Sequence, residues 1–352
     1  MARLLDLDFV SCLHSQTIYH AVAYCTTEAS SGTIILVSPE EPYVCIGYHQ
    51  VLEKEIDVEY CRKNNIPILR REVGGGAVYL DGDQLFFQCI FPKDKVPKRL
   101  DLLYKLFLQP AVNTYRTLGV EASYRPVNDI QVNGRKICGS GAARIEDATV
   151  VVGNIMFDFN YGEMSRSLRV PSEKFRDKLY DSMQAYLTTL GRELGYVPDR
   201  EKVKNILIKE FENILEVPLH RGTLTPDEQK MVADLDKRFT DPNWLYEKGV
   251  KLNHWVKVSS DIKVMESTWK SPGGLIRVIL RLKGDTIDDI LISGDFTFHP
   301  KDDLKNLEDQ LMGQPRNADS LLKTVEAFYI REDIQSPGVS PGDIVKAVMD
   351  EG

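Results

Sequence analysis

The sequence predicts an α+β protein with two domains, and three observations support this fold class. First, 352 residues exceed the size at which one hydrophobic core usually stops growing. Second, short apolar stretches bounded by turn residues indicate strands, and several of them follow one another in hairpin order. Third, longer stretches with apolar residues on one helical face lie between these groups of strands. Hydrophobic residues make up 43% of the chain, which is enough for two cores.

Composition excludes several classes of protein. The formal net charge is −8, which argues against general nucleic-acid binding, although a local basic patch could still dock an acidic protein. The six cysteines form no Cys-x-x-Cys pair, so neither a zinc site nor a disulfide framework is indicated. No secretory segment follows the N-terminus and no apolar run reaches transmembrane length. We therefore expect a cytoplasmic protein that does not bind membranes.

The strands expected in the first part of the chain are short and apolar. They cover residues 3–10, 33–37, 43–47, 66–69, 77–80, 85–91 and 149–159. We expect residues 43–47 to return antiparallel to 33–37, and residues 85–91 to form a hairpin with 77–80. Gly153 should mark a bulge or a close approach in the last of these strands.

Helices are expected where apolar residues recur every three to four positions. In the first part of the chain these are residues 14–26, 53–64, 99–118 and 172–195, with Ser172 able to cap the last of them. Pro110 should kink its helix or begin a second segment. Further helices cover 201–216 and 225–239, the latter opened by the capping box Thr225–Glu228. The rear part is a small α+β unit with strands at 262–266, 275–282 and 287–292 and helices at 304–311, 318–329 and 341–349.

The most informative stretch contains three consecutive glycines, Gly74 to Gly76, preceded by Arg70 and Arg71. Glycine runs cost backbone entropy, so they persist where the chain needs positive φ or where a ligand approaches the backbone. Backbone N–H groups beside an arginine suit a phosphate-bearing ligand. The stretch is neither a P-loop nor a dinucleotide fingerprint, because the spacing of both is absent. A flexible turn between strands is the alternative.

A second informative stretch is a hairpin around Asn133-Gly134. Asn-Gly between alternating residues predicts a two-residue type I′ turn. That turn sets the following opposite pairs: Val132 with Arg135, Gln131 with Lys136, and Ile130 with Ile137. The period of two then predicts a core face with Ile130, Val132 and Ile137, and an opposite face with Asp129, Gln131, Lys136 and Cys138. Lys136 lies diagonally from Asp129 and within its reach. The alternative is an exposed hairpin with a weak surface ion pair.

Both stretches resemble the lipoate-protein ligase A family. Residues 70–78 follow its Arg-Arg-x-x-Gly-Gly-Gly-x-Val segment, and Asn128-Asp129 with residues 134–144 follow its second signature. Residues 241–245 resemble the end of its catalytic domain. The resemblance implies a biotin/lipoate ligase-like catalytic domain over residues 1–245, with mixed sheets and surrounding helices. It also implies a small α+β accessory domain over residues 246–352.

The resemblance further implies a reaction and its residues. ATP and Mg²⁺ would activate lipoate or octanoate to the acyl-adenylate. The acyl group would then pass to a lysine of a carrier, namely a lipoyl domain, a glycine-cleavage H-like protein or another lipoate-binding protein. The family's catalytic lysine falls on Lys136, and the Mg²⁺ contact falls on Asp129. Ligand contacts fall on Arg71, Gly74, Gly75, Gly76, Ala77, Val78, Tyr79, Asn128, Asp129, Ser140 and Gly153. We expect a monomer.

Other positions are implied with less direct roles. An apolar tunnel for the acyl chain has the candidates Val44, Ile46, Val73 and Val150. A Gly-x-x-Gln segment beside the ligand pocket in the family corresponds to Gly47–Gln50, and its His49 is more often a satisfied histidine than a functional one.

The chain departs from the family at two histidines. Leu80-Asp81 stands where His-Asp is usual, and Val152-Gly153-Asn154 stands where His-Gly-Thr/Ser is frequent. Cys138 is a packing residue in our interpretation. Related octanoyltransferases place their cysteine nucleophile before the hairpin, where Pro126 and Val127 stand here, and Cys138 has no adjacent histidine.

Three alternatives stay open. A cysteine-free octanoyl or lipoyl transferase would use a carrier-bound thioester instead of ATP, with Lys136 as base. A biotin ligase shares the fold, but its Gly-Arg-Gly-Arg-type loop is absent. A non-catalytic protein that binds the acyl cofactor or the carrier would account for the missing histidines. The accessory domain discriminates, because in the family it accompanies ATP-dependent activation.

Overall fold

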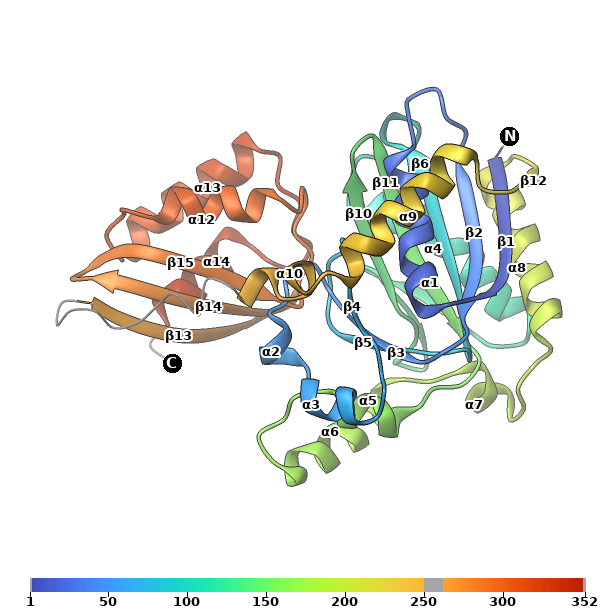
Figure 1. Ribbon diagram of the computed structural model, residues 1–352, viewed down its shortest axis with the longest axis horizontal. Coiled ribbons are helices and arrows are strands. Elements are labelled where there is room, and N and C mark those ends of the chain that lie inside the picture. The colour runs from blue at the N-terminus through green and yellow to red at the C-terminus, as the bar shows by residue number, and fades with distance from the viewer. Residues whose placement is uncertain (1, 250–261, 351–352) are drawn as a thin grey trace. The chain divides into compact units, whose positions relative to one another are not determined.

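The computed structural model describes residues 2–249 and 262–350, which form the α+β fold that the sequence predicts (Figure 1). They fall into two compact units. The first comprises Met1–Cys45, Ile56–Leu69 and Val78–Asp241, and the second Ile46–Glu55, Arg70–Ala77 and Pro242–Gly352. Residues 250–261 and 351–352 of the expected accessory domain lie outside the described residues. The domain boundary expected after residue 245 stays a prediction.

A six-stranded mixed sheet forms the centre of the first unit, in the order β10-β11-β6-β2-β1-β12. Its strands are β1 (Ala2–Val10), β2 (Thr33–Pro39), β6 (Gln84–Pro92), β10 (Ser140–Ile145), β11 (Ala148–Met156) and β12 (Leu219–Arg221). β1 is parallel to β2 and β12, and the other pairs are antiparallel. All seven residues of β2 are buried, as expected for a strand covered on both faces.

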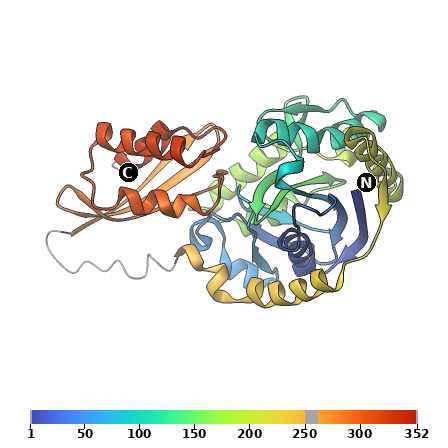
Figure 2. The same cartoon turned by 90° about the horizontal axis from the view of Figure 1, so that it is seen from above.

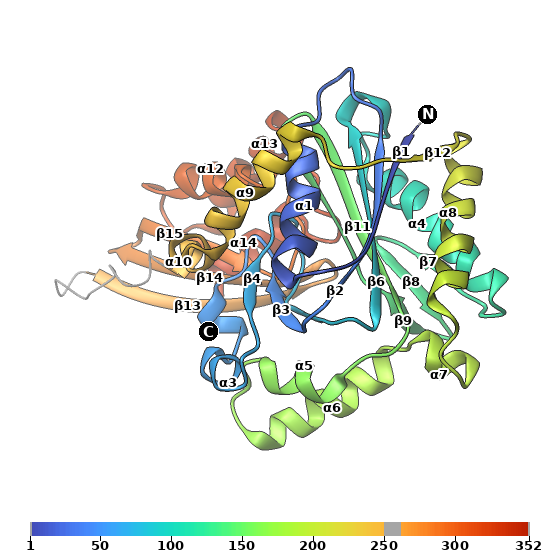
Figure 3. The same cartoon turned by 45° about the vertical axis from the view of Figure 1, so that its right-hand side comes forward.

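Two pairs of helices contribute to this burial. α1 (Cys12–Tyr24) runs beside α9 (Pro226–Thr240) over the sheet in both Figure 1 and Figure 3. α4 (Leu100–Thr117) packs with α8 (Arg200–Leu215), and their apolar residues share one core with β2 and β6 residues such as Ile34, Leu36 and Phe87. Pro110 lies inside α4, which continues as one helix, so the expected second segment does not form.

Two small sheets have most of their residues in the first unit, and the pairing of one of them differs from the expected pairing. One has the order β4-β3-β5, with β3 (Tyr43–Ile46), β4 (Ile68–Arg70) and β5 (Val78–Leu80). The other has the order β7-β8-β9, with β7 (Ser123–Arg125), β8 (Asp129–Val132) and β9 (Arg135–Cys138). β3 pairs with β5 and not with β2, whose two neighbours are β1 and β6. The expected hairpin of 77–80 with 85–91 was also wrong, because β5 pairs with β3 whereas β6 pairs with β2 and β11.

The remaining helices of the first unit are α3 (Val58–Lys63), α5 (Tyr161–Ser167), α6 (Glu173–Tyr186) and α7 (Leu190–Leu194). The single helix expected over 53–64 is wrong. It divides into α2 (Leu52–Glu55) and α3, because Asp57 starts a new helix by accepting from the Tyr60 N–H. Ser172 precedes α6, but its side chain makes no capping hydrogen bond. No helix among the described residues is long and apolar enough to cross a membrane.

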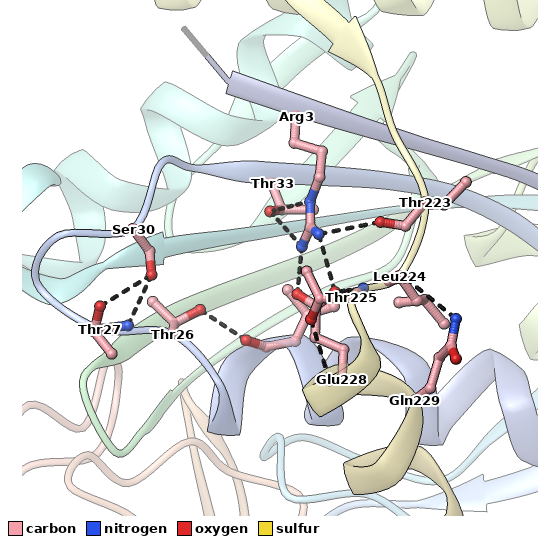
Figure 4. A network of polar contacts seen from close by, with 11 residues as sticks. Arg3, Thr26, Thr27, Ser30, Thr33, Thr223, Leu224, Thr225, Glu228 and Gln229 are labelled. Atoms are coloured by element: carbon pink, nitrogen blue, oxygen red, sulfur yellow. Dashed lines mark hydrogen bonds and ion pairs between the residues drawn. The ribbon is translucent and has the colours of Figure 1, made fainter.

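The first strand is tied to the capping box of α9. The Arg3 guanidinium donates to Glu228 Oε2 at 2.9 Å and to Thr33 Oγ1 at 3.2 Å, while Glu228 Oε2 accepts from the Thr225 N–H at 2.8 Å (Figure 4). Thr225 and Glu228 form the predicted capping box. The buried carboxylate of Glu228 thus caps α9 and also pairs with Arg3 of β1, which is distant from it in sequence.

The second unit contains a three-stranded antiparallel sheet with helices packed on it (Figures 1 and 2). Its elements are β13 (Ile262–Ser271), β14 (Gly274–Lys283), β15 (Thr286–Gly294), α12 (Asp303–Leu311), α13 (Ala318–Arg331) and α14 (Pro341–Met349), with the short α10 (Pro242–Leu245) and the 3-10 turn η2 (Glu247–Gly249) before them. The helices cover one sheet face with a shared apolar core. On the other face, Ile279 and Leu291 pack with Val51, so residues 46–55 belong to this unit.

Candidate functional site

The lysine hairpin folds as the sequence predicts at its turn. Asn133 and Gly134 have φ of 50° and 80°, the positive values that a type I′ turn requires. Val132 faces Arg135 and Gln131 faces Lys136. The register then shifts, so that Ile130 pairs with Cys138 and not with Ile137 as expected. This irregularity moves Cys138 from the predicted ligand face into the core.

Lys136 and Asp129 form an ion pair, with 2.7 Å between Nζ and Oδ1. The two side chains keep 24% and 18% of their surface exposed, so the pair is partly buried and still reachable from solvent. The Tyr186 hydroxyl donates to Asp129 Oδ2 at 3.4 Å. The Lys136 carbonyl accepts from the Thr188 N–H at 2.9 Å, which holds the backbone of β9 behind the ammonium group. The lysine is thus presented from a fixed strand.

Three further predicted residues of this unit, Asn128, Ser140 and Gly153, are linked to one another by hydrogen bonds and strand pairing next to the hairpin. Asn128 Nδ2 donates to the Ser140 carbonyl at 3.2 Å, and the Ser140 hydroxyl donates back to the Asn128 carbonyl. Ser140 lies opposite Gly153 in the pairing of β10 with β11. A Cβ on Gly153 would lie 2.3 Å from Cζ of Phe87, which confirms the expected close approach. This glycine is thus required for packing against an aromatic ring.

Two buried amides that the sequence did not indicate as site residues lie beside this arrangement. Asn154 Oδ1 accepts from the Gly139 N–H and Asn154 Nδ2 donates to Gln84 Oε1, both at 2.8 Å. Gln84 Nε2 donates to the Tyr79 carbonyl at 3.1 Å and to Asp81 Oδ1 at 3.3 Å. Burial raises the pKa of Asp81 to about 6. A signal existed only for Asn154, a polar residue in the mostly apolar strand expected over 149–159, whereas Gln84 lies just before the strand expected over 85–91.

Cys138 is fully buried in the core cluster, and desolvation raises the pKa of its thiol to about 12. The thiol is therefore protonated near neutral pH. Its burial is consistent with the interpretation of this cysteine as a packing residue.

The glycine stretch belongs to the second unit, where Arg70 and Arg71 have different surroundings. Arg70 is fully buried and donates to the carbonyl oxygens of Gly47, Tyr48, Gln50, Trp244 and Leu245, at 2.8 to 3.2 Å. Trp244 Nε1 donates back to the Arg70 carbonyl at 3.0 Å. Arg70 is therefore a structural residue that holds two other segments of backbone, residues 47–50 and residues 244–245.

Arg71 holds the glycine turn itself. Its Nη2 donates to the carbonyl oxygens of Gly74 and Gly76, at 2.9 and 2.8 Å. Gly75 has φ of 91°, and its N–H donates to the Phe296 carbonyl at 3.4 Å. A Cβ on Gly47 would lie 1.9 Å from the Gly75 oxygen, so the two segments touch through bare backbone. The glycine run thus meets a positive φ and close contacts.

His49 of the Gly47–Gln50 segment is also in the second unit. It is fully buried, with its ring stacked on Phe296 at 5.6 Å between centroids. Desolvation lowers its pKa to about 3, so the ring is neutral near pH 7. Gln50 Oε1 accepts from the Gly47 N–H at 2.9 Å and closes this turn.

The predicted site residues therefore fall into both compact units. Val78, Tyr79, Asn128, Asp129, Lys136, Ser140 and Gly153 lie in the first, and Arg71, Gly74, Gly75, Gly76 and Ala77 lie in the second. The tunnel candidates Val44, Ile46, Val73 and Val150 are all buried. Among the described residues, no group of three or more His, Cys, Asp or Glu side chains could hold a metal ion. Lys136 pairs with Oδ1 of Asp129, so Oδ2 of the same carboxylate is the oxygen that could contact a metal ion.

Comparison with known families identifies both parts of the chain. The profile of the lipoyl protein ligase A/B catalytic domain matches residues 16–212. The profile of the bacterial lipoate protein ligase C-terminus matches residues 264–347.

Individual proteins show the same similarity. Lipoate-protein ligase A subunit 1 of Thermoplasma acidophilum is 28% identical over 253 residues, which are 69% of this chain and 95% of that protein. Lipoate–protein ligase 2 of Staphylococcus aureus is 26% identical over 82% of both chains. A crystal structure of lipoate-protein ligase A bound with ATP aligns with a TM-score of 0.60 and 25% identity, covering 70% of this chain and 98% of that one.

Proposed function

Because the chain belongs to the lipoyl protein ligase A/B catalytic-domain family, we propose that it is an ATP-dependent lipoate-protein ligase. The observation that carries this proposal is the ion pair of Lys136 with Asp129, held on a fixed hairpin and open to solvent. The match of residues 264–347 to a bacterial ligase C-terminus supports a ligase over a transferase. Similar proteins named as ligases, and one structure bound with ATP, support it further.

In the proposed first step, a carboxylate oxygen of lipoate or octanoate attacks the α-phosphorus of ATP. The bond from this phosphorus to the bridging oxygen breaks, and pyrophosphate leaves. Two anions must approach each other, so a fixed cation lowers the barrier. Lys136 has this role in the proposal, with its ammonium group between the carboxylate and the α-phosphate. Arg71 and the N–H groups of residues 74–79, together with Asn128, Ser140 and Gly153, complete the proposed ligand contacts.

Magnesium is part of the same proposal. Mg²⁺ is commonly held by one or two carboxylates together with substrate phosphates. One carboxylate oxygen, Asp129 Oδ2, fits such a contact, so most ligands of the ion would come from the nucleotide and from water. The ion would neutralise phosphate charge.

In the proposed second step, the ε-amine of a carrier lysine attacks the carbonyl carbon of the acyl-adenylate. An amide bond forms, the mixed anhydride breaks, and AMP leaves. Lys136 would stabilise the developing charge on the departing phosphate. The carrier class is a lipoyl domain, which is consistent with a structure of a Thermoplasma acidophilum ligase described with its E2 lipoyl domain.

Isotope exchange between pyrophosphate and ATP tests the activation step without any carrier. We expect exchange that requires lipoate or octanoate and that falls below detection in Lys136→Ala. Lys93→Ala is the matched control, because Lys93 also pairs with an aspartate, Asp147 at 2.5 Å, at a position outside the predicted site. No exchange with any acid, from protein shown to be folded, would contradict the proposal.

An octanoyltransferase is the second candidate, because octanoyltransferase LipM of Geobacillus kaustophilus is 24% identical over 59% of this chain. Such a reaction would transfer octanoate from a carrier thioester without ATP. The burial of Cys138 speaks against a thiol intermediate on that residue. Octanoyl transfer from a carrier in the absence of ATP would favour this candidate.

A further inference from the structure

Asn154 and Gln84 form a continuous pair of buried amides in the first unit. Asn154 lies on β11 and is 8% exposed, while Gln84 begins the neighbouring strand β6 and is 1% exposed. The two strands pair directly, with Asn154 opposite Phe86 and Gln84 opposite Met156. The amides therefore meet diagonally across the ladder, where 2.8 Å separates Asn154 Nδ2 from Gln84 Oε1.

The backbone groups that the two amides contact, the Gly139 N–H and the Tyr79 carbonyl, determine how the amides are oriented. At one end the Gly139 N–H can only donate, so the Asn154 oxygen must face it. The nitrogen of Asn154 then faces the Gln84 oxygen. At the other end the Tyr79 carbonyl can only accept, so the Gln84 nitrogen must face it. These two requirements agree. Turning the Asn154 amide would break two hydrogen bonds, and turning the Gln84 amide would break three.

The pair connects the six-stranded sheet with the sheet β4-β3-β5 and with Gly139, the residue between β9 and β10. Tyr79 lies on β5 of the sheet β4-β3-β5, and Gln84 and Asn154 lie on the six-stranded sheet. Gly139 follows β9 directly, three residues after Lys136. The two stretches that the sequence singled out, the end of the glycine segment and the lysine hairpin, are therefore joined by side chains from neither of them.

We propose that Asn154 and Gln84 are positioning residues that hold the backbone at Tyr79 and the backbone at Gly139 in fixed relation for the activation step. This inference rests on the proposed function. Neither side chain needs to contact substrate. The side chain of Asn154 carries both an acceptor oxygen and a donor nitrogen, which lets this one residue accept from Gly139 and donate to Gln84 at once.

We expect the amide pair to affect the reaction rate, through the positions of the reacting groups, more than the stability of the fold. Reacting groups must be held within a fraction of an ångström, and a displacement of about 1 Å can cost about 100-fold in rate. An isosteric change at residue 154 tests this demand. In Asn154→Asp one carboxylate oxygen still accepts from Gly139, but the other cannot donate to Gln84. Gln84 must turn its nitrogen toward Asp, and it then releases the Tyr79 carbonyl.

The experiment measures acid-dependent pyrophosphate exchange for Asn154→Asp and Gln84→Glu in the full chain. We expect kcat to fall about 10- to 100-fold, with KM for ATP and for the acid changed less than about 3-fold. Hydrogen–deuterium exchange should quicken in both residues 77–83 and residues 137–141 of each variant. This second measurement needs no activity.

Asn113→Asp is the matched control, because it alters a similar chain of amides elsewhere in the same unit. Gln109 Nε2 donates to Asn113 Oδ1 and Asn113 Nδ2 donates to Glu210 Oε2, both at 2.8 Å. We expect this variant to lower the melting temperature while its kcat stays within about 2-fold of wild type.

Two results would overturn the inference. One is a kcat within about 2-fold of wild type in both variants, and the other is hydrogen exchange that quickens at one of the two segments only. A wild-type protein without acid-dependent exchange would instead overturn the proposed function. Hydrogen exchange would then still decide whether the amide pair holds the two segments together.

Discussion

The ammonium group of Lys136 lies 2.7 Å from Oδ1 of Asp129, across a hairpin whose strands carry them diagonally to each other. The pair keeps a cation and a carboxylate together at a partly exposed place. In the proposed reaction the lysine would stabilise the substrate anions and the aspartate would help to hold the magnesium ion, so the two charges would have separate roles.

Neutralising the aspartate should weaken the metal contact while leaving the lysine charge in place. We expect Asp129→Asn to lower kcat for pyrophosphate exchange about tenfold and to raise the Mg²⁺ concentration needed for half-maximal rate. A magnesium titration of the rate measures this. Asp147→Asn, which removes the partner of Lys93, is the control. An unchanged magnesium dependence in Asp129→Asn would remove Asp129 from the metal site.

The two adjacent arginines should respond differently to the same substitution. Arg70→Lys leaves several buried carbonyl groups without a donor, so we expect the free energy of unfolding to fall by about 2–4 kcal/mol. We expect Arg71→Lys to lower the free energy of unfolding less than Arg70→Lys does, and to lower the rate of pyrophosphate exchange more. Urea unfolding and initial rates of both variants measure the difference. A larger loss of stability in Arg71→Lys would reverse the assignment.

We expect Gly75 to be required both for its positive φ and for the space that a side chain would take beside Arg71. Gly75→Ala places a Cβ 3.3 Å from Arg71 Nη2 at φ of 91°, so we expect loss of most exchange activity. Gly119→Ala is the control, because Gly119 has φ of 90° and no neighbour within 4 Å of an added Cβ. Each substitution should cost about 1–2 kcal/mol of stability by unfolding, and only the first should change the rate. Equal exchange rates in the two variants would show that Gly75→Ala acts only through backbone strain.

Cys138 should be dispensable for chemistry. Its thiol pKa of about 12 leaves almost no thiolate near neutral pH, so we expect Cys138→Ala to keep its rate within about 2-fold. Iodoacetamide should label Cys25, which is partly exposed, well before Cys138 in the native protein. Mass spectrometry of the labelled peptides gives the order. Rapid labelling of Cys138, together with an inactive alanine variant, would support a thiol mechanism instead.

Glu228 should make stability depend on pH in acid. Burial raises its pKa, but hydrogen bonds from Arg3 and Thr225 outweigh this and lower it below the ordinary value of 4.5. The group therefore adds stability that is fully present above about pH 4.5 and is lost as pH falls through the lowered value. Glu228→Gln should unfold more easily at pH 7, with a gap to wild type that narrows toward pH 3. Urea midpoints at several pH values measure the gap, and a constant gap would contradict this role.

Much of the local structure followed from the sequence. Asn133-Gly134 determined a turn with two positive φ angles, and Thr225 to Glu228 determined a capping box. The glycine run was correctly expected to meet close backbone contacts. Such features depend on residues within a few positions of one another, so their physical causes are contained in short segments. The register of the hairpin likewise predicted that Lys136 lies within reach of Asp129, and the two side chains form an ion pair.

The tertiary structure decided what depends on distant partners. It paired β3 with β5 and not with β2, and its irregular register placed Cys138 in the core. It also separated the roles of Arg70 and Arg71, which are adjacent in sequence and chemically identical. Asn154 and Gln84 are 70 residues apart, and each is an ordinary polar residue in its own strand. The sequence by itself determined the turns, caps and signatures because local backbone preference specifies them, whereas burial and long-range hydrogen bonding exist only once separate strands have come together.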